Sequence, residues 1–239
     1  MSGRGKFKAI STKIRGLLNL IFSDRASHES TTFLVSSGRS GSTWLTDILS
    51  SPPDSRILFE PFHPSRGIVE LGRLRYTYLS PTQENESLAR LIENVMIGKI
   101  RRPWIEQLNR PGAFTYNRRL IKVVRATLLL PWLSNYFPEC RFILLIRHPA
   151  AVIRSQLKGN WELSSQRLRS QISLAETINL KLFDQFGWPT SGFVSNLVFW
   201  AIENHVAYKH AKKHGCLIVR YEDLCLNTAG ELSLSLIHI

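Results

Sequence analysis

Eight consecutive residues in the first fifth of the chain have the composition of an anion-binding loop: Ser37-Gly38-Arg39-Ser40-Gly41-Ser42-Thr43-Trp44. Glycine tolerates positive φ angles and lets the backbone approach a ligand closely, while hydroxyl groups and a guanidinium supply hydrogen-bond donors. Such a loop can bind a phosphate, although an ordinary turn between a strand and a helix can carry the same residue types. The P-loop pattern G-x-x-x-x-G-K-[ST] is not met, because no lysine precedes the Ser42–Thr43 pair.

A second pair of anion-binding side chains is expected about a hundred residues later. The apolar run Arg141–Ile146 is typical of a central strand in a parallel sheet, and Arg147 follows it directly. Pro149 can open the next helix, where its missing N–H is not needed. Ser155 lies on that predicted helix, so Arg147 and Ser155 can converge on one anion.

Glu60 is the best candidate for a general base. It follows the apolar run Ile57–Phe59 and therefore lies at the carboxyl end of a predicted strand, where open α/β sheets bind their ligands. Its alternative role is that of an exposed or ion-paired carboxylate. His63 is the alternate base, or a residue that shapes the loop between two prolines. Lys122, in the predicted strand Leu120–Arg125, can reach a transferred group or can pair with an acid.

The elements that must position these side chains alternate between strands and helices. Phe33–Ser36 is a β-branched and aromatic run typical of a buried strand, and a helix follows, with Leu45 and Leu49 on its apolar face. Apolar strands that alternate with helices predict an α/β fold with three layers, in which helices flank a central parallel sheet.

The chain is expected to form one domain. Residues 1–31 are predicted to be a basic, flexible leader, and residues 32–239 to be the domain itself, with a truncated or abnormal C-terminus because 232–239 alternate Ser and Leu. Residues 65–118 lack a clear period except at 87–97, where helical spacing occurs. We expect them to form an irregular insertion that contributes substrate contacts.

The formal net charge of +13 favours an anionic partner, which can be nucleic acid, a lipid surface or a small polyanionic ligand. Nucleic acid is not expected, because zinc spacing, heptads and RNP-like motifs are all absent. Part of the excess is local, since five basic residues precede the first acid, Asp24: Arg4, Lys6, Lys8, Lys13 and Arg15. This basic arm can make weak contact with an anionic membrane.

The cysteines and the N-terminal apolar run suggest a location. Cys140, Cys216 and Cys225 have no metal-ligand spacing and are expected to be free thiols. The run Gly16–Phe22 is too short to span a membrane. A cytoplasmic location is therefore expected.

The motifs resemble those of sulfotransferases that use 3′-phosphoadenosine 5′-phosphosulfate (PAPS). Ser37–Trp44 resembles their 5′-phosphosulfate loop, and Leu145–Ser155 resembles their 3′-phosphate motif, in which an Arg and a Ser eight residues later grip that phosphate. Ile121–Arg125 and Val219–Leu224 are similar to landmarks of the carbohydrate-type branch. The chain departs from the pattern at His148, where an acid is common, and it lacks a recognisable C-terminal cofactor segment.

The resemblance implies a P-loop-like fold and in-line transfer of a sulfuryl group from PAPS to an acceptor hydroxyl on a sugar or glycolipid, leaving PAP. No metal is required. Glu60 would act as base, helped by Arg39 and Lys122, and Trp44 would stack on adenine or pack in the core. The expected cofactor contacts are Gly38, Arg39, Ser40, Gly41, Ser42, Thr43, Trp44, Arg147 and Ser155. Two alternatives remain: a P-loop-type nucleotide kinase or hydrolase, and a basic protein that binds nucleic acid or lipid.

Overall fold

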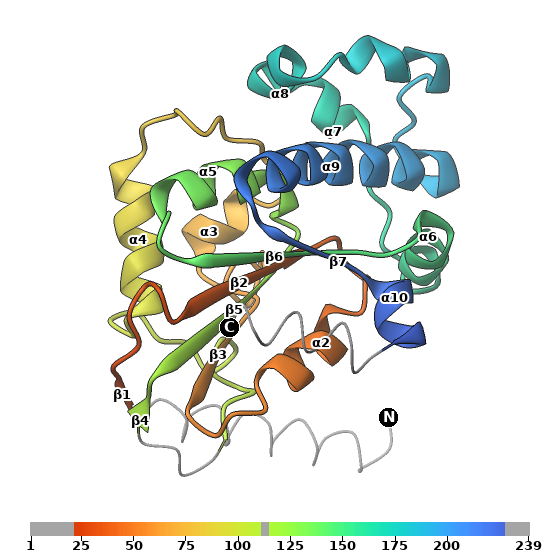
Figure 1. Cartoon of the computed structure of the whole chain (residues 1–239). Helices are drawn as coiled ribbons and strands as arrows, with labels where there is room; N and C mark the ends of the chain where they lie inside the picture. The colour runs from red at the N-terminus through yellow and green to blue at the C-terminus, as the bar shows by residue number, and fades with distance from the viewer. Residues whose placement is uncertain (1–21, 111–114, 228–239) are drawn as a thin grey trace.

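The computed structural model describes residues 22–110 and 115–227 (Figure 1). Its centre is a five-stranded sheet in which every neighbouring pair of strands is parallel. In spatial order the strands are β3 (Ser55–Phe59), β5 (Arg118–Val124), β2 (Thr31–Ser36), β6 (Arg141–Ile146) and β7 (Leu217–Arg220). The predicted parallel sheet is confirmed, and the strand that precedes the candidate loop is its middle strand.

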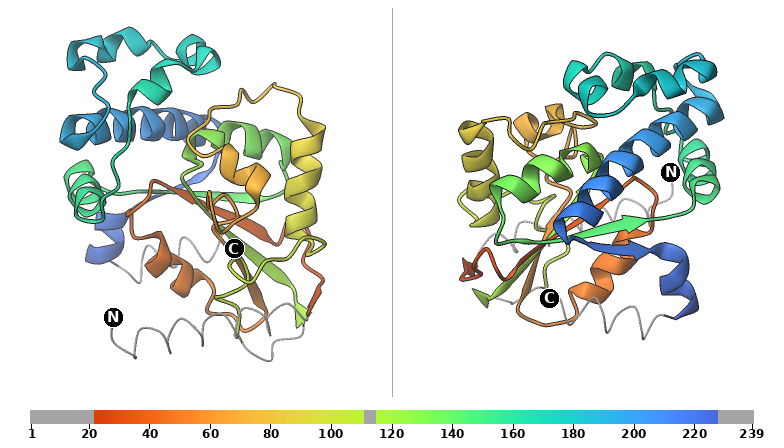
Figure 2. Two further views of the ribbon diagram at one scale, coloured as in Figure 1. Left: turned by 180° about the vertical axis from the view of Figure 1, so that it is seen from behind. Right: turned by 45° about the horizontal axis from the view of Figure 1, so that its top comes forward.

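Helices cover both faces of this sheet because neighbouring residues of each strand point to opposite sides. Leu34 and Ile143 pack in one core with α2 (Ser42–Leu49) and α10 (Tyr221–Leu226). Phe33 and Phe142 stack in the other core, which α4 (Glu86–Met96), α5 (Leu130–Tyr136) and α9 (Gly192–His214) cover. Figures 1 and 2 show the helices above and below the strands. The predicted three-layer, P-loop-like α/β fold is confirmed.

The remaining helices are short. A layer on the outer side of α9 contains α7, α8 and η2, which bury Leu168, Leu174 and Leu180 against Val198 and Ile202 of that helix (Figure 1). The bounds are α3 (Val69–Arg73), η1 (Thr127–Leu129), α6 (Pro149–Lys158), α7 (Gln166–Arg169), α8 (Ile172–Thr177) and η2 (Leu180–Phe186). None of the helices in the described ranges combines the length and apolar character needed to cross a lipid bilayer.

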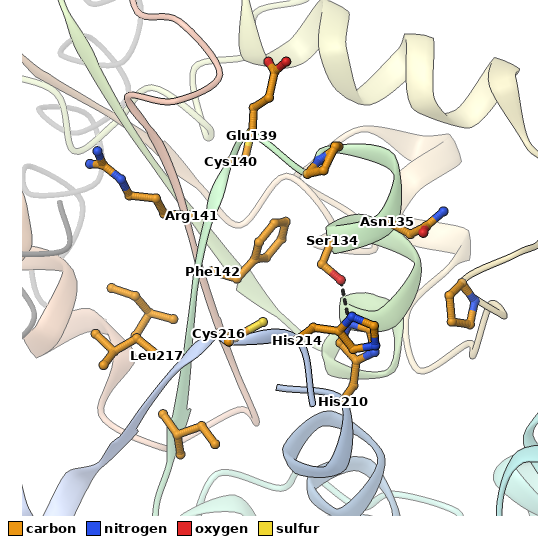
Figure 3. A pocket seen from close by; sticks show the side chains of 15 residues that line it. Ser134, Asn135, Glu139, Cys140, Arg141, Phe142, His210, His214, Cys216 and Leu217 are labelled. Atoms are coloured by element: carbon orange, nitrogen blue, oxygen red, sulfur yellow. Dashed lines mark hydrogen bonds between the residues drawn. The ribbon is translucent and has the colours of Figure 1, made fainter. Parts of the chain in front are cut away.

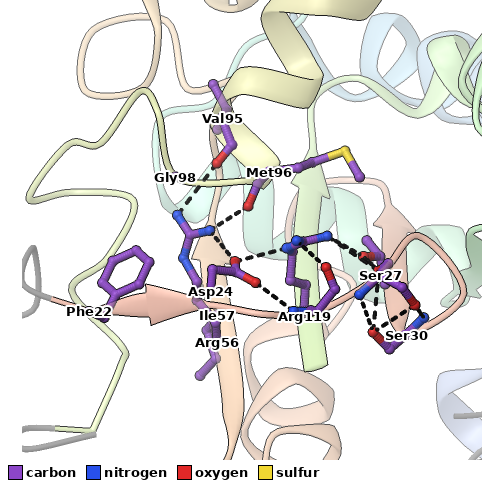
Figure 4. Close-up of polar contacts among 12 residues, drawn as sticks. Phe22, Asp24, Ser27, Ser30, Arg56, Ile57, Val95, Met96, Gly98 and Arg119 are labelled. Carbon is purple, nitrogen blue, oxygen red and sulfur yellow. Dashed lines mark hydrogen bonds and ion pairs between the residues drawn. The ribbon is translucent and has the colours of Figure 1, made fainter. Parts of the chain in front are cut away.

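Part of the stretch expected to be a leader, residues 1–31, lies within the described structure. Residues 23–24 form β1 (Ser23–Asp24), which pairs with β4 (Thr115–Tyr116). The Asp24 carboxylate is buried, with Oδ2 2.6 Å from Arg56 Nη1 and 2.8 Å from Arg119 Nε (Figure 4). These two ion pairs attach the segment to β3 and β5. Residues 1–21 and 228–239 lie outside the described residues, as do the expectations about the basic arm and the C-terminus.

Arg56 and its neighbour Ile57 also anchor the segment expected to be an irregular insertion. Arg56 also pairs with Glu106, and the backbone N–H of Ile57 donates to Asn109 Oδ1 over 2.6 Å. Both partners lie between α4 and β4, so this stretch packs firmly on β3. The predicted helix at 87–97 is confirmed as α4, and Asn85 caps it by accepting from Leu88 N.

Candidate active site

The carboxyl ends of β2, β3, β5 and β6 surround a cavity of about 360 Å³. Ligands of open α/β sheets bind at this edge. The cavity gathers most of the residues predicted from the sequence, from separate stretches of the chain. Its lining consists of Arg39, Gly41, Ser42, Thr43, Glu60, His63, Trp104, Lys122, Val124, Arg125, Arg147, Ser155 and Trp161.

The candidate loop has a tight backbone. Arg39 (φ 74°) and Gly41 (φ 89°) both adopt the left-handed conformation. A Cβ on Gly41 would lie 2.4 Å from the Tyr221 ring, and one on Gly38 would lie 2.3 Å from the Trp161 ring. The two glycines therefore leave room for aromatic rings that pack against the loop, a requirement that the loop sequence alone did not reveal.

Arg147 and Ser155 both contact Arg39 in the lining of the cavity. Arg39 Nε donates to Ser155 Oγ over 2.9 Å, and Arg147 Nη1 donates to the Arg39 carbonyl over 3.4 Å. The guanidinium of Arg147 is 4.1 Å from the centre of the Tyr221 ring. The structure thus brings these residues together as predicted, while their role in binding stays a prediction.

Two buried polar atoms at this loop lack hydrogen-bond partners among the described residues. They are Ser40 Oγ, on a fully buried side chain, and Arg147 Nε. Most buried polar groups in proteins are hydrogen-bonded, so unpaired donors beside a polar cavity fit an anionic ligand. These donors therefore suit phosphate groups, one at the Gly38–Thr43 loop and one beside Arg147.

Glu60 forms ion pairs with two basic residues of the cavity lining. Its Oε2 is 2.7 Å from Arg125 Nη1 and its Oε1 is 3.3 Å from Lys122 Nζ. Lys122 Nζ also donates to Thr43 Oγ1 over 2.7 Å, which links the acid to the loop. Burial lowers the pKa of Lys122, and the Glu60 carboxylate opposes that shift. The ion-paired alternative for Glu60 is what the structure shows; its role as a base stays a prediction.

His63 shapes its own loop. Its Nδ1 accepts from the backbone N–H groups of Ser65 and Arg66, at 3.3 and 3.2 Å. A neutral imidazole has one acceptor nitrogen, so this arrangement places the proton on Nε2. Burial and then the Arg125 guanidinium lower the pKa of His63. In this tautomer the acceptor nitrogen of His63, Nδ1, already accepts two backbone hydrogen bonds.

Two aromatic residues and one arginine of the site were not singled out from the sequence. The Arg125 guanidinium is 4.1 Å from the centre of the Trp161 ring, and Arg125 has a left-handed backbone (φ 69°). Its position directly after β5 was the available signal, since residues at that strand edge face the ligand. Nothing in the sequence linked Trp104 or Trp161 to the cavity, because only tertiary packing places them there.

Trp44 lies outside the cavity lining. Its side chain is 38% exposed and its ring meets Tyr221 edge-on, with centroids 5.8 Å apart. The expectation that it packs in the core is wrong, because Leu45 and Leu49 form the buried face of α2. Stacking of Trp44 on an adenine stays a prediction.

A sequence profile described as "Sulfotransferase family" matches residues 32–234. This chain belongs to the sulfotransferase family. The match includes the loop, Glu60, Lys122, Arg147 and Ser155, so the cavity lies within the family domain. No curated protein matches the chain.

Three solved sulfotransferase structures are similar to this family member. Mouse sulfotransferase SULT7A1 complexed with PAP is 15% identical (TM-score 0.45), and the match covers 95% of this chain and 62% of that one. The sulfotransferase domain from the curacin biosynthetic pathway is 16% identical (TM-score 0.48), and the match covers 89% of this chain and 74% of that one. A sulfotransferase from Alicyclobacillus acidocaldarius is 12% identical (TM-score 0.42), and the match covers 82% of this chain and 75% of that one. The chain thus spans less than two thirds of the mouse enzyme.

A larger cavity of about 920 Å³ lies elsewhere on this sulfotransferase-family domain (Figure 3). It lies at the amino-terminal halves of β6 and β7, against α5 and the end of α9. Ser134 Oγ and His210 Nε2 are 2.6 Å apart there, and the rings of His210 and His214 stack. None of the predicted site residues lines it, so its size does not make it the catalytic cavity.

Proposed function

We propose that this chain transfers a sulfuryl group from PAPS to an acceptor hydroxyl. One observation carries the proposal. A single cavity at the carboxyl edge of the sheet holds one carboxylate, Glu60, among four cations, Arg39, Lys122, Arg125 and Arg147. A cationic cavity with one anionic group suits a polyanionic donor and one proton acceptor. Membership of the sulfotransferase family supports this assignment.

The donor would be held at two stations. The Gly38–Thr43 loop and the first N–H groups of α2 would bind the 5′-phosphosulfate, with Ser40 Oγ as an additional donor. Arg147 and Ser155 would bind the 3′-phosphate, and the free Nε of Arg147 supports this role. Trp44 lies next to the loop, and its exposed ring can stack on the adenine.

The proposed transfer is an in-line displacement. Glu60 takes the proton of the acceptor hydroxyl, and the hydroxyl oxygen forms a bond to sulfur. The bond between sulfur and the bridging oxygen breaks, and its electron pair stays on the 5′-phosphate of PAP. Lys122, which lies between Glu60 and Thr43, stabilises the negative charge that develops on that oxygen. None of these steps calls for a metal ion.

The proposed acceptor is a sugar or a glycolipid. The carbohydrate-type motifs Ile121–Arg125 and Val219–Leu224 support this class. The cavity also presents Trp104 and Trp161. Indole rings offer large, flat apolar surfaces, and the two rings of the cavity lining can pack against a sugar ring.

A transfer assay with labelled PAPS and a panel of simple glycosides and glycolipids tests the proposal. We expect Glu60→Gln to lower turnover by about 10²–10⁴-fold, the usual contribution of a general base, with the affinity for PAP largely kept. Glu70→Gln, at an exposed position on α3, is the matched control and should retain full turnover. Near-normal turnover of the Glu60 variant would remove Glu60 from the mechanism and leave His63 as the base.

A further inference from the structure

Arg125 follows the last residue of β5 and contacts the proposed base directly. Its Nη1 donates to Glu60 Oε2 over 2.7 Å, and its guanidinium is 4.1 Å from the centre of the Trp161 ring. The side chain is 12% exposed and lines the candidate cavity. Among the described residues, Nε and Nη2 have no hydrogen-bond partner. This guanidinium therefore keeps donors for a ligand of the cavity.

The arginines that hold the fold together use their donors fully. Arg56 donates from all three guanidinium nitrogens, to two carboxylates and two backbone carbonyls. Arg119 also donates from all three, to a carboxylate, a hydroxyl and two backbone carbonyls. Arg125 donates from one nitrogen to the described residues, and in this it resembles Arg147, whose buried Nε also has no partner there. Its hydrogen bonding is thus that of a ligand-binding arginine and not that of a structural one.

The backbone of Arg125 is left-handed (φ 69°). Few residues other than glycine adopt this conformation, and such strained residues cluster at active sites and ligand-binding sites. The N–H of Tyr76 donates to the Arg125 carbonyl over 2.6 Å, which helps to hold the turn in place. The backbone geometry therefore also fits a residue that is placed for a ligand.

Glu60 pairs with two cations through different oxygens. Lys122 contacts Oε1 and also donates to Thr43 of the loop, whereas Arg125 contacts Oε2. In the proposed in-line transfer, the acceptor oxygen and the bridging oxygen lie on opposite sides of sulfur, so the remaining sulfuryl oxygens point sideways. Nε and Nη2 form one edge of a planar guanidinium, and such an edge can donate to two oxygens of one anionic group.

We propose that Arg125 binds the non-bridging oxygens of the transferred sulfuryl group while its Nη1 holds Glu60 beside them. This inference rests on the proposed function, because the sulfuryl group is that of PAPS. Arg125 keeps its proton throughout, and no covalent bond to it forms or breaks. PAP lacks the sulfuryl group and retains both phosphates. Arg125 should therefore distinguish the donor PAPS from its product PAP.

Calorimetric titration of PAPS and of PAP, with no acceptor present, tests this role in Arg125→Gln. We expect the affinity for PAPS to fall by about 10–100-fold and that for PAP by less than about 3-fold, because only PAPS loses hydrogen bonds to a charged group. Loss of a cation weakens the binding of every anion to some extent. The two ligands carry the same formal charge when fully ionised, so the ratio of their affinities reports the sulfuryl contact alone.

Two other arginines supply controls. Arg147→Ala should weaken PAPS and PAP equally, because both carry the 3′-phosphate. Arg118→Gln, an exposed position at the opposite end of β5, should change neither affinity. Equal loss of PAPS and PAP in Arg125→Gln would overturn the role of Arg125 and leave the donor assignment standing. If the unaltered protein binds neither ligand, both proposals fail.

A thermal melt shows whether Arg125→Gln folds. If it does not, Arg125→Lys decides, because lysine keeps the charge and can pair with Glu60 but lacks the planar fork. The ratio of PAPS affinity to PAP affinity should be several-fold lower in this variant than in the unaltered protein, roughly the loss of one hydrogen bond to a charged group. An unchanged ratio would contradict the proposal.

Discussion

Arg39 joins the two ends of the proposed phosphate site. Its side chain donates to Ser155, its carbonyl accepts from Arg147, and its backbone adopts a left-handed conformation that few non-glycine residues adopt. Backbone strain of this kind is common in ligand-binding loops, where the surrounding structure holds it in place. One residue therefore links the 5′ station to the 3′ station.

Arg39→Ala is expected to weaken PAP binding by about 10–100-fold, the range for losing one hydrogen bond to a charged group. The fold should stay intact, because Arg39 belongs to none of the hydrophobic clusters. Arg154→Ala, an exposed position on α6, is the matched control and should bind PAP normally. Calorimetry together with a thermal melt separates the outcomes. An unfolded Arg39 variant, or one that binds PAP as before, would assign the loop a structural role.

At the scale of elements, buried ion pairs attach two other segments to β3, the strand that precedes Glu60. Arg56 lies in β3 and pairs with Asp24 of β1 (Figure 4) and with Glu106 of the stretch before β4. The backbone N–H of Phe59 donates to the Ile105 carbonyl over 2.8 Å, one residue before Glu60. Because Trp104 precedes Ile105, the same contacts bring it to the cavity.

Asp24→Asn is expected to destabilise the domain by about 3 kcal/mol or more, because it leaves the charges of Arg56 and Arg119 poorly compensated in the interior. Glu29→Gln, an exposed position in the same segment, should change stability by less than about 0.5 kcal/mol. Urea denaturation of both variants measures the difference. Equal stability of the two would show that β1 contributes nothing to the fold.

The elements were predictable where local pattern determines structure. The apolar runs that became β2, β3, β5 and β6 lie in the sheet as expected, because a strand buried on both faces needs continuous apolar residues. Asp24 was not recognised as part of the fold, since its partner Arg119 lies 95 residues away. Its position at the end of a basic leader gave no local sign of burial.

The site was predictable to a similar extent and for the same reason. Arg147 and Glu60 directly follow apolar strands, and parallel strands bring their carboxyl ends to one edge. Trp161 and Tyr221 lie against the loop only because Gly38 and Gly41 lack side chains, a relation between distant segments. The residues next to strand ends were therefore found, and those placed by long-range packing were not.

At the scale of the whole molecule, the positive charge suits the anionic donor that is proposed to bind. The chain carries a net charge of +13, and the cavity lining has four basic side chains and a single carboxylate. Such a field raises the local concentration of an anionic ligand and speeds its association. It does not by itself distinguish one nucleotide from another. Selection between nucleotides must come from the two phosphate stations.

The most direct test of the account is a calorimetric comparison of PAP with 5′-AMP, which lacks the 3′-phosphate. Arg147 and Ser155 should favour PAP by at least ~10-fold and up to ~10³-fold, since each hydrogen bond to a charged group contributes roughly 1.5–3 kcal/mol. Arg147→Ala should remove most of that preference and leave 5′-AMP binding nearly unchanged. Equal affinity of the unaltered protein for PAP and 5′-AMP would contradict the assignment of PAPS as the donor.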